Sequence, residues 1–419
     1  MSVVLVIVFC ILMVLVIPVG HALIIASGAA LLWQGSLPLM LVPQQMFAQT
    51  QSFPMLALPF FMLAGSLMMG GKLGKELLAF ATELMGRFRG GPLSTTVVAS
   101  VVFGGVSGSA VANASALGSI LIPWQRKQGY PAGLCAANNA TSAVIDILIP
   151  PSIPMILFSL VSGVSVADLF TAGVLPGILM AVGFIFVCYW ISRRRGYVSE
   201  APSLGRRELI RVAVRSSPAL LMPVLILLGL RFGYATPTEI AVLTVIYSLA
   251  LSAFLYRDLS WRRFYDAMIE SGVATGIVML VIMGSAAVGW ILTFDQVPVR
   301  FAEWVSTTLQ EPILIILAMN VLMLLVGMPL DLPPAILLLG PIFVPLAATI
   351  GMDPVQLGLV MILNLGIGLY TPPIGTTLFI SSSVAGSSLS ETTRELWPFF
   401  AVAMLLLLGL SYIPALTLY

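Results

Sequence analysis

The chain has 419 residues, of which 59% are hydrophobic and only 9% are charged. A soluble protein carries about 25% charged residues, so this composition excludes soluble enzymes, and the small net charge of +2 argues against nucleic acid as a partner. Apolar runs of about 20 residues recur along the whole chain, and we therefore predict an all-α polytopic protein embedded in a lipid bilayer.

The first apolar run, residues 3–17, predicts a retained membrane helix. No basic residue precedes it, since the first Lys or Arg is Lys72, so it lacks the charged start of a cleaved signal peptide. The three cysteines, Cys10, Cys135 and Cys188, lie in apolar stretches without CxxC spacing. We interpret them as small packing residues rather than as disulfide or zinc ligands.

Further along, the chain alternates between plain membrane helices and interrupted ones. The plain stretches predict helices over residues 2–18, 20–34, 53–71, 168–192, 217–233, 236–256, 271–293 and 392–418. Gly, Pro, Ser, Thr and Asn interrupt four other segments, 92–125, 131–163, 312–350 and 355–388. Such interruptions are tolerated at membrane depth only where the backbone lines a cavity or is buried in protein. We predict re-entrant helical hairpins at 92–125 and 312–350, and broken helices at 131–163 and 355–388.

The distribution of Lys and Arg predicts which side of the membrane each loop faces. With the hairpins placed as above, 17 of the 19 basic residues fall on one face, and only Arg231 and Arg300 fall on the other. Cytoplasmic loops are rich in Lys and Arg, so the majority face is predicted to be cytoplasmic and both termini external. The basic stretch 193–216 is interpreted as a cytoplasmic linker, with lipid-headgroup binding by its arginines as an alternative.

The glycines and prolines of the chain repeat at an offset of 222 residues. Gly129 aligns with Gly351, and the pair Pro150-Pro151 aligns with Pro372-Pro373. Because the charge distribution places the two hairpins on opposite sides, we predict two inverted repeats. The first, residues 1–192, comprises scaffold helices 1–71, an interfacial arm 72–89, the hairpin 92–125, the broken helix 131–163 and a final helix 168–192. The second, residues 217–419, comprises scaffold helices 217–293, an interfacial arm 297–311, the hairpin 312–350, the broken helix 355–388 and a final helix 392–418.

The two arms are predicted from apolar side chains that share one helical face. Leu73, Leu77 and Phe80 do so in the first arm, with charged residues such as Arg87 around them, and Val297 and Phe301 do so in the second. This pattern is typical of a helix that lies in the membrane plane. Ordinary surface helices are the alternative.

The first hairpin carries the richest polar stretch, FGGVSGSAVANASALGSILIP over residues 103–123. Ser107, Gly108, Ser109 and Asn113 are expected near its tip. Hydroxyls, an amide oxygen and freed carbonyls there could surround a hard cation, and the N-terminus of a half-helix would attract a carboxylate. Close helix packing around small residues is the alternative.

The first broken helix, AANNATSAVIDILIPPSIPMILF, is expected to face the same tip. Its prolines remove amide donors, which leaves the carbonyls of residues 147–149 free to point into a cavity. Asp146 is an acid at membrane depth and so a functional candidate, with a structural hydrogen bond as the alternative. Other side chains are expected to line the same space, namely Asn138, Asn139, Thr141 and Ser142.

The second half offers a second oxygen-rich cation site. Asp331, between Pro329 and Pro333, is expected at the tip of the second hairpin. The second broken helix is marked by Asn364, Gly366, Gly368, Thr371, Pro372, Pro373, Gly375 and Thr376. Close packing around small residues is again the alternative.

Several chemistries have no sequence support. The only histidine, His21, lies in a turn between two apolar runs, where a structural role is favoured over a proton relay. No HExxH, GxSxG or Walker A motif is present. Few ionisable groups are expected inside the membrane, so coupling to sodium is favoured over coupling to protons.

Three segments in order resemble the large membrane subunit of TRAP transporters: GGVSGSAVANASALGSILIP, NNATSAVIDILIPPSIPMI and LGIGLYTPPIGTTLF. The resemblance implies an elevator-type transporter of the ion-transporter superfamily, in a bacterial inner membrane. It implies import of an organic acid (a C4-dicarboxylate, a sialic acid or another sugar acid) driven by two or more sodium ions. It also implies two partners, a separate small four-helix membrane subunit and a soluble periplasmic substrate-binding protein.

The resemblance assigns residues to three sites. A first sodium site would use Ser107, Ser109, Asn113, Ile149 and Pro150. A second sodium site would use Gly327, Asp331, Gly366, Thr371 and Pro372. The substrate would lie between the hairpin tips and contact Ser107, Gly108, Ser109, Asn113, Pro151, Ser152, Pro373, Gly375 and Thr376.

Three alternatives remain open. The nearest is a stand-alone sodium/dicarboxylate or anion symporter with the same architecture. An intramembrane enzyme would need clustered His, Asp, Glu or Cys at membrane depth, which the sequence lacks. A passive channel would not need two inverted hairpins.

Overall fold

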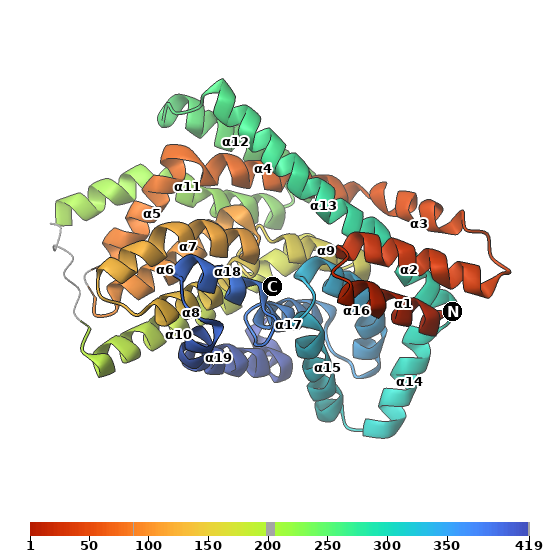
Figure 1. The fold of residues 1–419 in the computed structure, drawn as a ribbon. Coiled ribbons are helices and arrows are strands. Elements are labelled where there is room, and N and C mark those ends of the chain that lie inside the picture. The colour runs from red at the N-terminus through yellow and green to blue at the C-terminus, as the bar shows by residue number, and fades with distance from the viewer. Residues whose placement is uncertain (87, 198–205, 418–419) are drawn as a thin grey trace.

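The computed structural model describes residues 1–86, 88–197 and 206–417, and these residues form helices joined by short turns, without a strand (Figure 1). Arg87 of the first predicted arm, residues 198–205 of the predicted linker and residue 418 of the last predicted helix lie outside the described residues.

The N-terminal part contains helices on either side of a sharp bend. They are α1 (Ser2–Val14), α2 (Val19–Gln34), α3 (Leu41–Thr50), the short 3-10 turn η1 (Phe53–Leu56), α4 (Ala57–Met69) and α5 (Gly71–Met85). The axes of α4 and α5 differ by 73°. The apolar face of α5 is buried through Leu73, Leu77 and Ala81, so the amphipathic pattern of the sequence corresponds to a helix that turns away from the preceding one.

The next helices contain the first two interruptions. They are α6 (Gly91–Ser107), α7 (Ala110–Lys127), α8 (Ala132–Ser142), the 3-10 turn η2 (Ala143–Ile147), α9 (Ile153–Ser162) and α10 (Val166–Arg195). Gly108 ends α6 with a left-handed φ of 64°, and Ser109 caps α7 by accepting a hydrogen bond from the amide of Ala112. Ser152 caps α9 in the same way after the cis Pro150-Pro151 bond.

The remaining helices follow a similar order. They are α11 (Arg206–Arg231), α12 (Pro237–Ala250), the π-helical turn η3 (Leu251–Leu255), α13 (Trp261–Phe294), α14 (Val297–Leu309), α15 (Pro312–Gly327), α16 (Leu332–Thr349), α17 (Pro354–Gly368), α18 (Thr376–Ala385), α19 (Leu389–Tyr412) and the 3-10 turn η4 (Pro414–Leu416). A second cis bond, Pro372-Pro373, lies between α17 and α18.

Two helices begin earlier than the sequence predicts, and a third was not predicted. α13 begins at Trp261 rather than at residue 271, because Ser260 caps a first turn whose charged residues interrupt the apolar pattern of the sequence. α11 begins at Arg206, inside the predicted linker, where basic residues interrupt the apolar pattern of the sequence. α3 was not predicted, since its Pro and Gln residues make it only weakly apolar.

Among the described residues, six helices are long and apolar enough to cross a bilayer, which fits a polytopic membrane protein. They are α10, residues 210–231 of α11, residues 237–255, α13, α16 and α19. α16 qualifies by length, although the sequence predicts it to be half of a re-entrant hairpin. Its 18 residues measure about 27 Å, close to the thickness of the hydrocarbon core. Length alone therefore does not distinguish a membrane-spanning helix from one arm of a re-entrant hairpin.

The helices form two groups (Figure 1). In the first, which we call the outer layer, α13 lies along α2, α3 and α4, and α12 packs against α4. In the second, which we call the hairpin core, α8 is surrounded by α7, α18 and α19. The groups meet where α4 packs on α6 and α13 packs on α16. The first of these contacts is close, because a Cβ on Gly65 would lie 2.9 Å from the carbonyl oxygen of Val106.

Several structural features recur at the offset of 222 residues. Both ends of α7 (Ala110–Lys127) coincide with those of α16 (Leu332–Thr349) at this offset. The two cis Pro-Pro bonds coincide as well, and so do the left-handed residues Gly129 and Gly351.

Candidate functional site

The tip of the first hairpin is held by a buried carboxylate. Asp146, in η2, is 0% exposed, and its two oxygens accept hydrogen bonds from the backbone amides of Gly108 (3.2 Å) and Ser109 (3.0 Å). These amides lie at the start of α7, where the sequence predicts attraction of a substrate carboxylate. The side chain of Asp146 therefore already occupies this place, and the tip is bonded to the broken helix behind it.

Close backbone packing fixes the same tip. A Cβ on Gly108 would lie 2.6 Å from the carbonyl oxygen of Pro151, and one on Gly104 would lie 3.0 Å from the Cα of Asp146. Only glycine allows the hairpin to approach the break this closely. The structure thus brings Gly108 together with Pro151, as the sequence predicts for the first half.

Asn113 lies one turn beyond the tip and is fully buried. Its side-chain oxygen is 3.4 Å from the hydroxyl of Ser100, and its side chain also lies within hydrogen-bonding distance of the buried carboxylate of Asp146. Asn113 therefore belongs to the polar cluster that surrounds Asp146 at the first tip. Ser107 and Ser109 are half-buried on either side of Gly108.

Several polar residues of the first broken helix have structural partners instead of a free surface. The hydroxyl of Ser152 donates to the carbonyl of Ile147 at 2.6 Å. The amide of Asn139 donates to the carbonyl of Ala114 and to the hydroxyl of Ser381. Asn138, Thr141 and Ser142 likewise bond within the hairpin core. Asn138 and Asn139 join α8 to neighbouring helices, whereas the other three side chains bond to groups four or five residues away in the chain. None of the five lines the cavity described below.

The second hairpin ends at a carboxylate that faces open space. Asp331 precedes α16, is exposed, and accepts a hydrogen bond from the hydroxyl of Thr376 at 3.2 Å. Gly327, at the end of α15, packs on the second broken helix, because a Cβ on Gly368 would lie 2.5 Å from its carbonyl carbon. The structure therefore brings Asp331 and Thr376 together, and it places Gly327 against the end of α17.

Other residues predicted for the second half have different surroundings. The hydroxyl of Thr371 donates to the carbonyl of Ile367. Gly366 packs on the first broken helix, since a Cβ there would lie 2.6 Å from Ile147. Gly375 packs on the carbonyl of Leu369, at 2.5 Å from a Cβ position.

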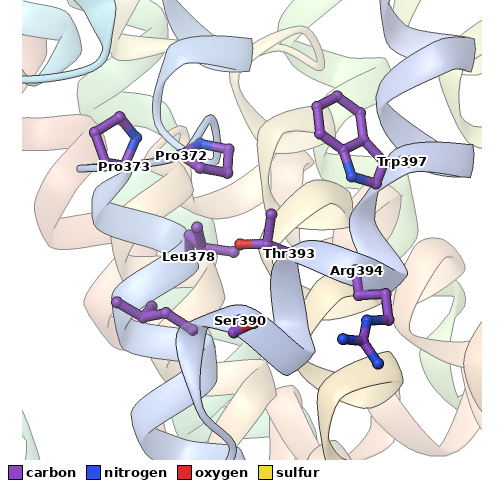
Figure 2. Close-up of a pocket in the computed structure, with 8 residues that line it drawn as sticks. Pro372, Pro373, Leu378, Ser390, Thr393, Arg394 and Trp397 are labelled. Atoms are coloured by element: carbon purple, nitrogen blue, oxygen red, sulfur yellow. The ribbon is translucent and has the colours of Figure 1, made fainter.

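Pro372 and Pro373 border a separate cleft of about 440 Å³. Figure 2 shows the two prolines on one side of the view and Trp397 and Arg394 of α19 on the other. The remaining lining residues are Leu378, Leu389, Ser390 and Thr393. Pro373, a predicted substrate contact, thus lies on this cleft and is not among the residues that line the central cavity.

A central cavity of about 580 Å³ lies between the hairpin core and the outer layer. On the core side it is lined by both hairpin tips and both breaks, through residues 108–111, 331–334, Ile147, Ile153, Pro154 and Leu369. On the outer side it is lined by residues 18–21, Met62, Ile277, Val278, Leu280 and Val281. A volume of this size suits a small organic molecule.

The sequence located the tips but not the outer wall of this cavity. Gly108, Ser109 and Asp331 were predicted site residues and line it, whereas His21, Met62 and the α13 residues were missed. The outer wall is formed by residues that are distant in sequence, and their apolar pattern predicts only plain membrane helices. His21 is therefore the only residue of this wall that the sequence could have marked as a site candidate.

The two halves place their carboxylates on different elements. At the offset of 222 residues, Asp331 corresponds to Ser109, and Asp146 corresponds to Gly368. Neither carboxylate takes part in an ion pair with the described residues, and no Lys or Arg lines the cavity. Within the described part of the chain, no three His, Cys, Asp or Glu side chains are grouped closely enough to hold a metal ion on their own.

Comparisons with known proteins agree over nearly the whole chain. The model of the family described as "Tripartite ATP-independent periplasmic transporter, DctM component" matches residues 6–416. The uncharacterized protein y4mL of Sinorhizobium fredii is 72% identical and covers 100% of both chains. The C4-dicarboxylate TRAP transporter large permease protein DctM of Pseudomonas aeruginosa is 35% identical, over 89% of this chain and 87% of the relative. The sialic acid TRAP transporter large permease protein SiaM of Vibrio cholerae is 34% identical, over 96% of this chain and 94% of the relative.

The fold is shared with solved structures. The YdaH transporter of Alcanivorax borkumensis superimposes with a TM-score of 0.60 at 15% sequence identity, covering 88% of this chain and 85% of that chain. At this identity the likeness concerns the fold alone.

Proposed function

The chain belongs to the DctM family, the large membrane components of tripartite ATP-independent periplasmic (TRAP) transporters, and from this premise we propose that it imports a small organic acid together with sodium. The resemblance seen in the sequence motifs is thereby confirmed. A family of transporter components also removes the intramembrane enzyme from the alternatives.

One observation carries the sodium proposal: two carboxylates at the hairpin tips have no basic partner. Asp146 is fully buried, and Asp331 faces the cavity. Negative charge at both tips, with no Lys or Arg beside it, would repel an anionic substrate. Sodium ions, bound by hydroxyls, carbonyls and carboxylates near the tips, would offset this repulsion. Ser107, Ser109 and the carbonyls of residues 149–150 are the proposed oxygen donors at the first tip.

The second sodium ion is proposed at the other tip. Asp331 and Thr376 supply a carboxylate and a hydroxyl in contact with each other. Gly327 lies where α15 meets the second broken helix, so its carbonyl and those of Gly366 and the Thr371-Pro372 segment are the remaining proposed donors. The acid would lie in the central cavity between the two tips.

For the movement we propose an elevator between two inverted repeats. The division into a hairpin core and an outer layer supports it, because the central cavity lies at their junction. The recurrence of helix ends, cis bonds and left-handed glycines at one offset supports the repeats. In this mechanism the hairpin core would carry acid and sodium past a fixed outer layer.

We propose that the acid is a C4-dicarboxylate, a sialic acid or another sugar acid, as the names of two relatives suggest. The family description places the chain in a tripartite system. The other two components would be a small four-helix membrane subunit and a soluble periplasmic binding protein. The charge distribution supports an inner-membrane location with both termini in the periplasm.

The decisive experiment is uptake into proteoliposomes that hold the large and small subunits, with the binding protein added outside. Radiolabelled succinate, malate, N-acetylneuraminate and gluconate would be tested with a sodium gradient, and with potassium in its place under the same imposed potential. We expect uptake of one acid with sodium only, because potassium would not replace sodium at the proposed tip sites. The imposed potential supplies about 2.3 kcal/mol per net charge and 100 mV equally in both arms, so it does not account for a difference between them. Equal uptake in potassium would reject sodium coupling.

The second candidate is a stand-alone symporter. The fold is also that of the YdaH transporter, so the fold alone does not separate the two candidates. The same proteoliposomes without the small subunit and the binding protein separate the two candidates. Sodium-driven uptake by the large subunit alone would favour the symporter, and uptake only with all three components would favour the tripartite system.

A further inference from the structure

The outer wall of the central cavity is almost entirely apolar. Met62, Ile277, Val278, Leu280 and Val281 offer no side chain that donates a hydrogen bond. His21, in the first turn of α2, is the exception and lies on the same wall. Among the described residues that line the cavity, only His21 and Asp331 carry a titratable side chain.

The ring of His21 is exposed and makes no hydrogen bond within the described part of the chain, although its backbone amide donates to the carbonyl of Pro18. The sequence favours a structural role for His21, and the described residues offer its ring no hydrogen-bond partner. Both ring nitrogens are therefore free to bond with a group in the cavity that His21 lines.

The position of His21 is fixed by tight packing beside it. A Cβ on Gly20 would lie 3.1 Å from Leu280, and one on Gly284 would lie 3.1 Å from the carbonyl oxygen of Gly20. α2 and α13 are therefore in backbone contact at the edge of the cavity. His21 is therefore placed at the edge of the cavity by packed helices of the outer layer.

We propose that His21 binds the carboxylate of the transported acid from the outer wall of the central cavity. The cavity lacks Lys and Arg, and the amides at the first tip are bonded to Asp146. An imidazole keeps at least one N–H in either charge state, so it donates a hydrogen bond to a carboxylate without any change of protonation. The serine hydroxyl at the first tip and the imidazole opposite it would hold the acid from two sides.

This inference rests on the proposed transport function and adds a directional consequence. If the hairpin core moves while the outer layer stays, His21 faces the acid in one end state and not in the other. The contact with His21 would therefore strengthen binding on one side of the membrane only.

The test uses proteoliposomes with both membrane subunits and the binding protein, and whichever of succinate, malate, N-acetylneuraminate or gluconate the wild type imports. For His21→Ala we expect KM to rise by about 10- to 100-fold, as for the loss of one hydrogen bond to a charged group, with little change in Vmax. The rise should appear in only one transport direction. His21→Gln, which retains an N–H donor, should recover part of the affinity. Leu32→Ala, on an exposed part of α2 outside the cavity, should leave KM unchanged.

Chemical modification gives an independent readout. Because His21 is the only histidine of the chain, diethyl pyrocarbonate applied to protein purified without a histidine tag should carbethoxylate one ring. Sodium plus the imported acid should slow that reaction. An unchanged KM for His21→Ala in both directions, with unprotected modification, would overturn the inference. Failure of the wild type to import any of the four acids would instead overturn the proposed function.

Discussion

Gly108 at the first hairpin tip allows a quantitative prediction. Its φ is +64°, and a Cβ there would lie 2.6 Å from the carbonyl oxygen of Pro151, closer than the 3.0 Å that such contacts essentially never fall below. The left-handed backbone costs an alanine about 1–2 kcal/mol, and forcing a methyl group into a packed site costs about 1–3 kcal/mol more. Gly108→Ala should therefore destabilise the protein by about 2–5 kcal/mol.

Gly129 provides the matched control. Its φ is +84°, but no heavy atom lies within 4 Å of a Cβ there, so Gly129→Ala should show the backbone cost of about 1–2 kcal/mol alone. The assay is the apparent melting temperature of the purified protein in sodium and in potassium, followed by tryptophan fluorescence. Gly108→Ala should melt below Gly129→Ala and should need more sodium for half-maximal uptake. Equal melting temperatures for the two variants would refute the packing argument.

Three further predictions concern the second tip, the hairpin core and the topology. Asp331→Ala should weaken sodium activation of uptake by about tenfold or more, as expected for the loss of a charged ligand. Thr376→Val, which keeps the carboxylate, should weaken sodium activation less. Equal sodium curves for wild type and Asp331→Ala would remove Asp331 from the site. Asn139→Leu should lower the free energy of unfolding by about 2–3 kcal/mol, because two buried hydrogen bonds are lost. The control is Thr50→Val, which removes an exposed hydrogen bond to a carbonyl three residues away and should leave thermal stability nearly unchanged. Alkaline phosphatase fused to the C-terminus should be active, and green fluorescent protein fused to the C-terminus should not fluoresce. The reverse pattern would contradict the predicted external termini.

The interruptions of the helices could be predicted because they depend on local chemistry. Proline removes a backbone donor wherever it stands, so the breaks at Pro150-Pro151 and Pro372-Pro373 follow from the sequence. The tip at Gly108-Ser109 follows from a glycine beside a capping serine. The three motifs built from these residues also identified the TRAP family, which the comparisons confirm.

The surroundings of those residues could not be predicted, because they depend on contacts between distant segments. Asp146 was assigned either a functional or a structural role, and only the structure shows that its oxygens bind the amides of the hairpin tip. Pro373 was assigned to the substrate, and only the structure shows that it lines a separate cleft together with Arg394 and Trp397. His21 reaches the cavity only through the packing of α2 on α13.

The position of α8 between α7 and α18 has a consequence for biosynthesis. The amide of Asn139 bonds to Ala114 on one side and to Ser381 on the other, and the second partner is 242 residues further along the chain. At about 5–20 residues per second, a ribosome adds that length in roughly 10–50 s. During this interval the nascent first half lies in the bilayer with one buried amide incompletely bonded, so its final packing has to wait for the last helices to insert.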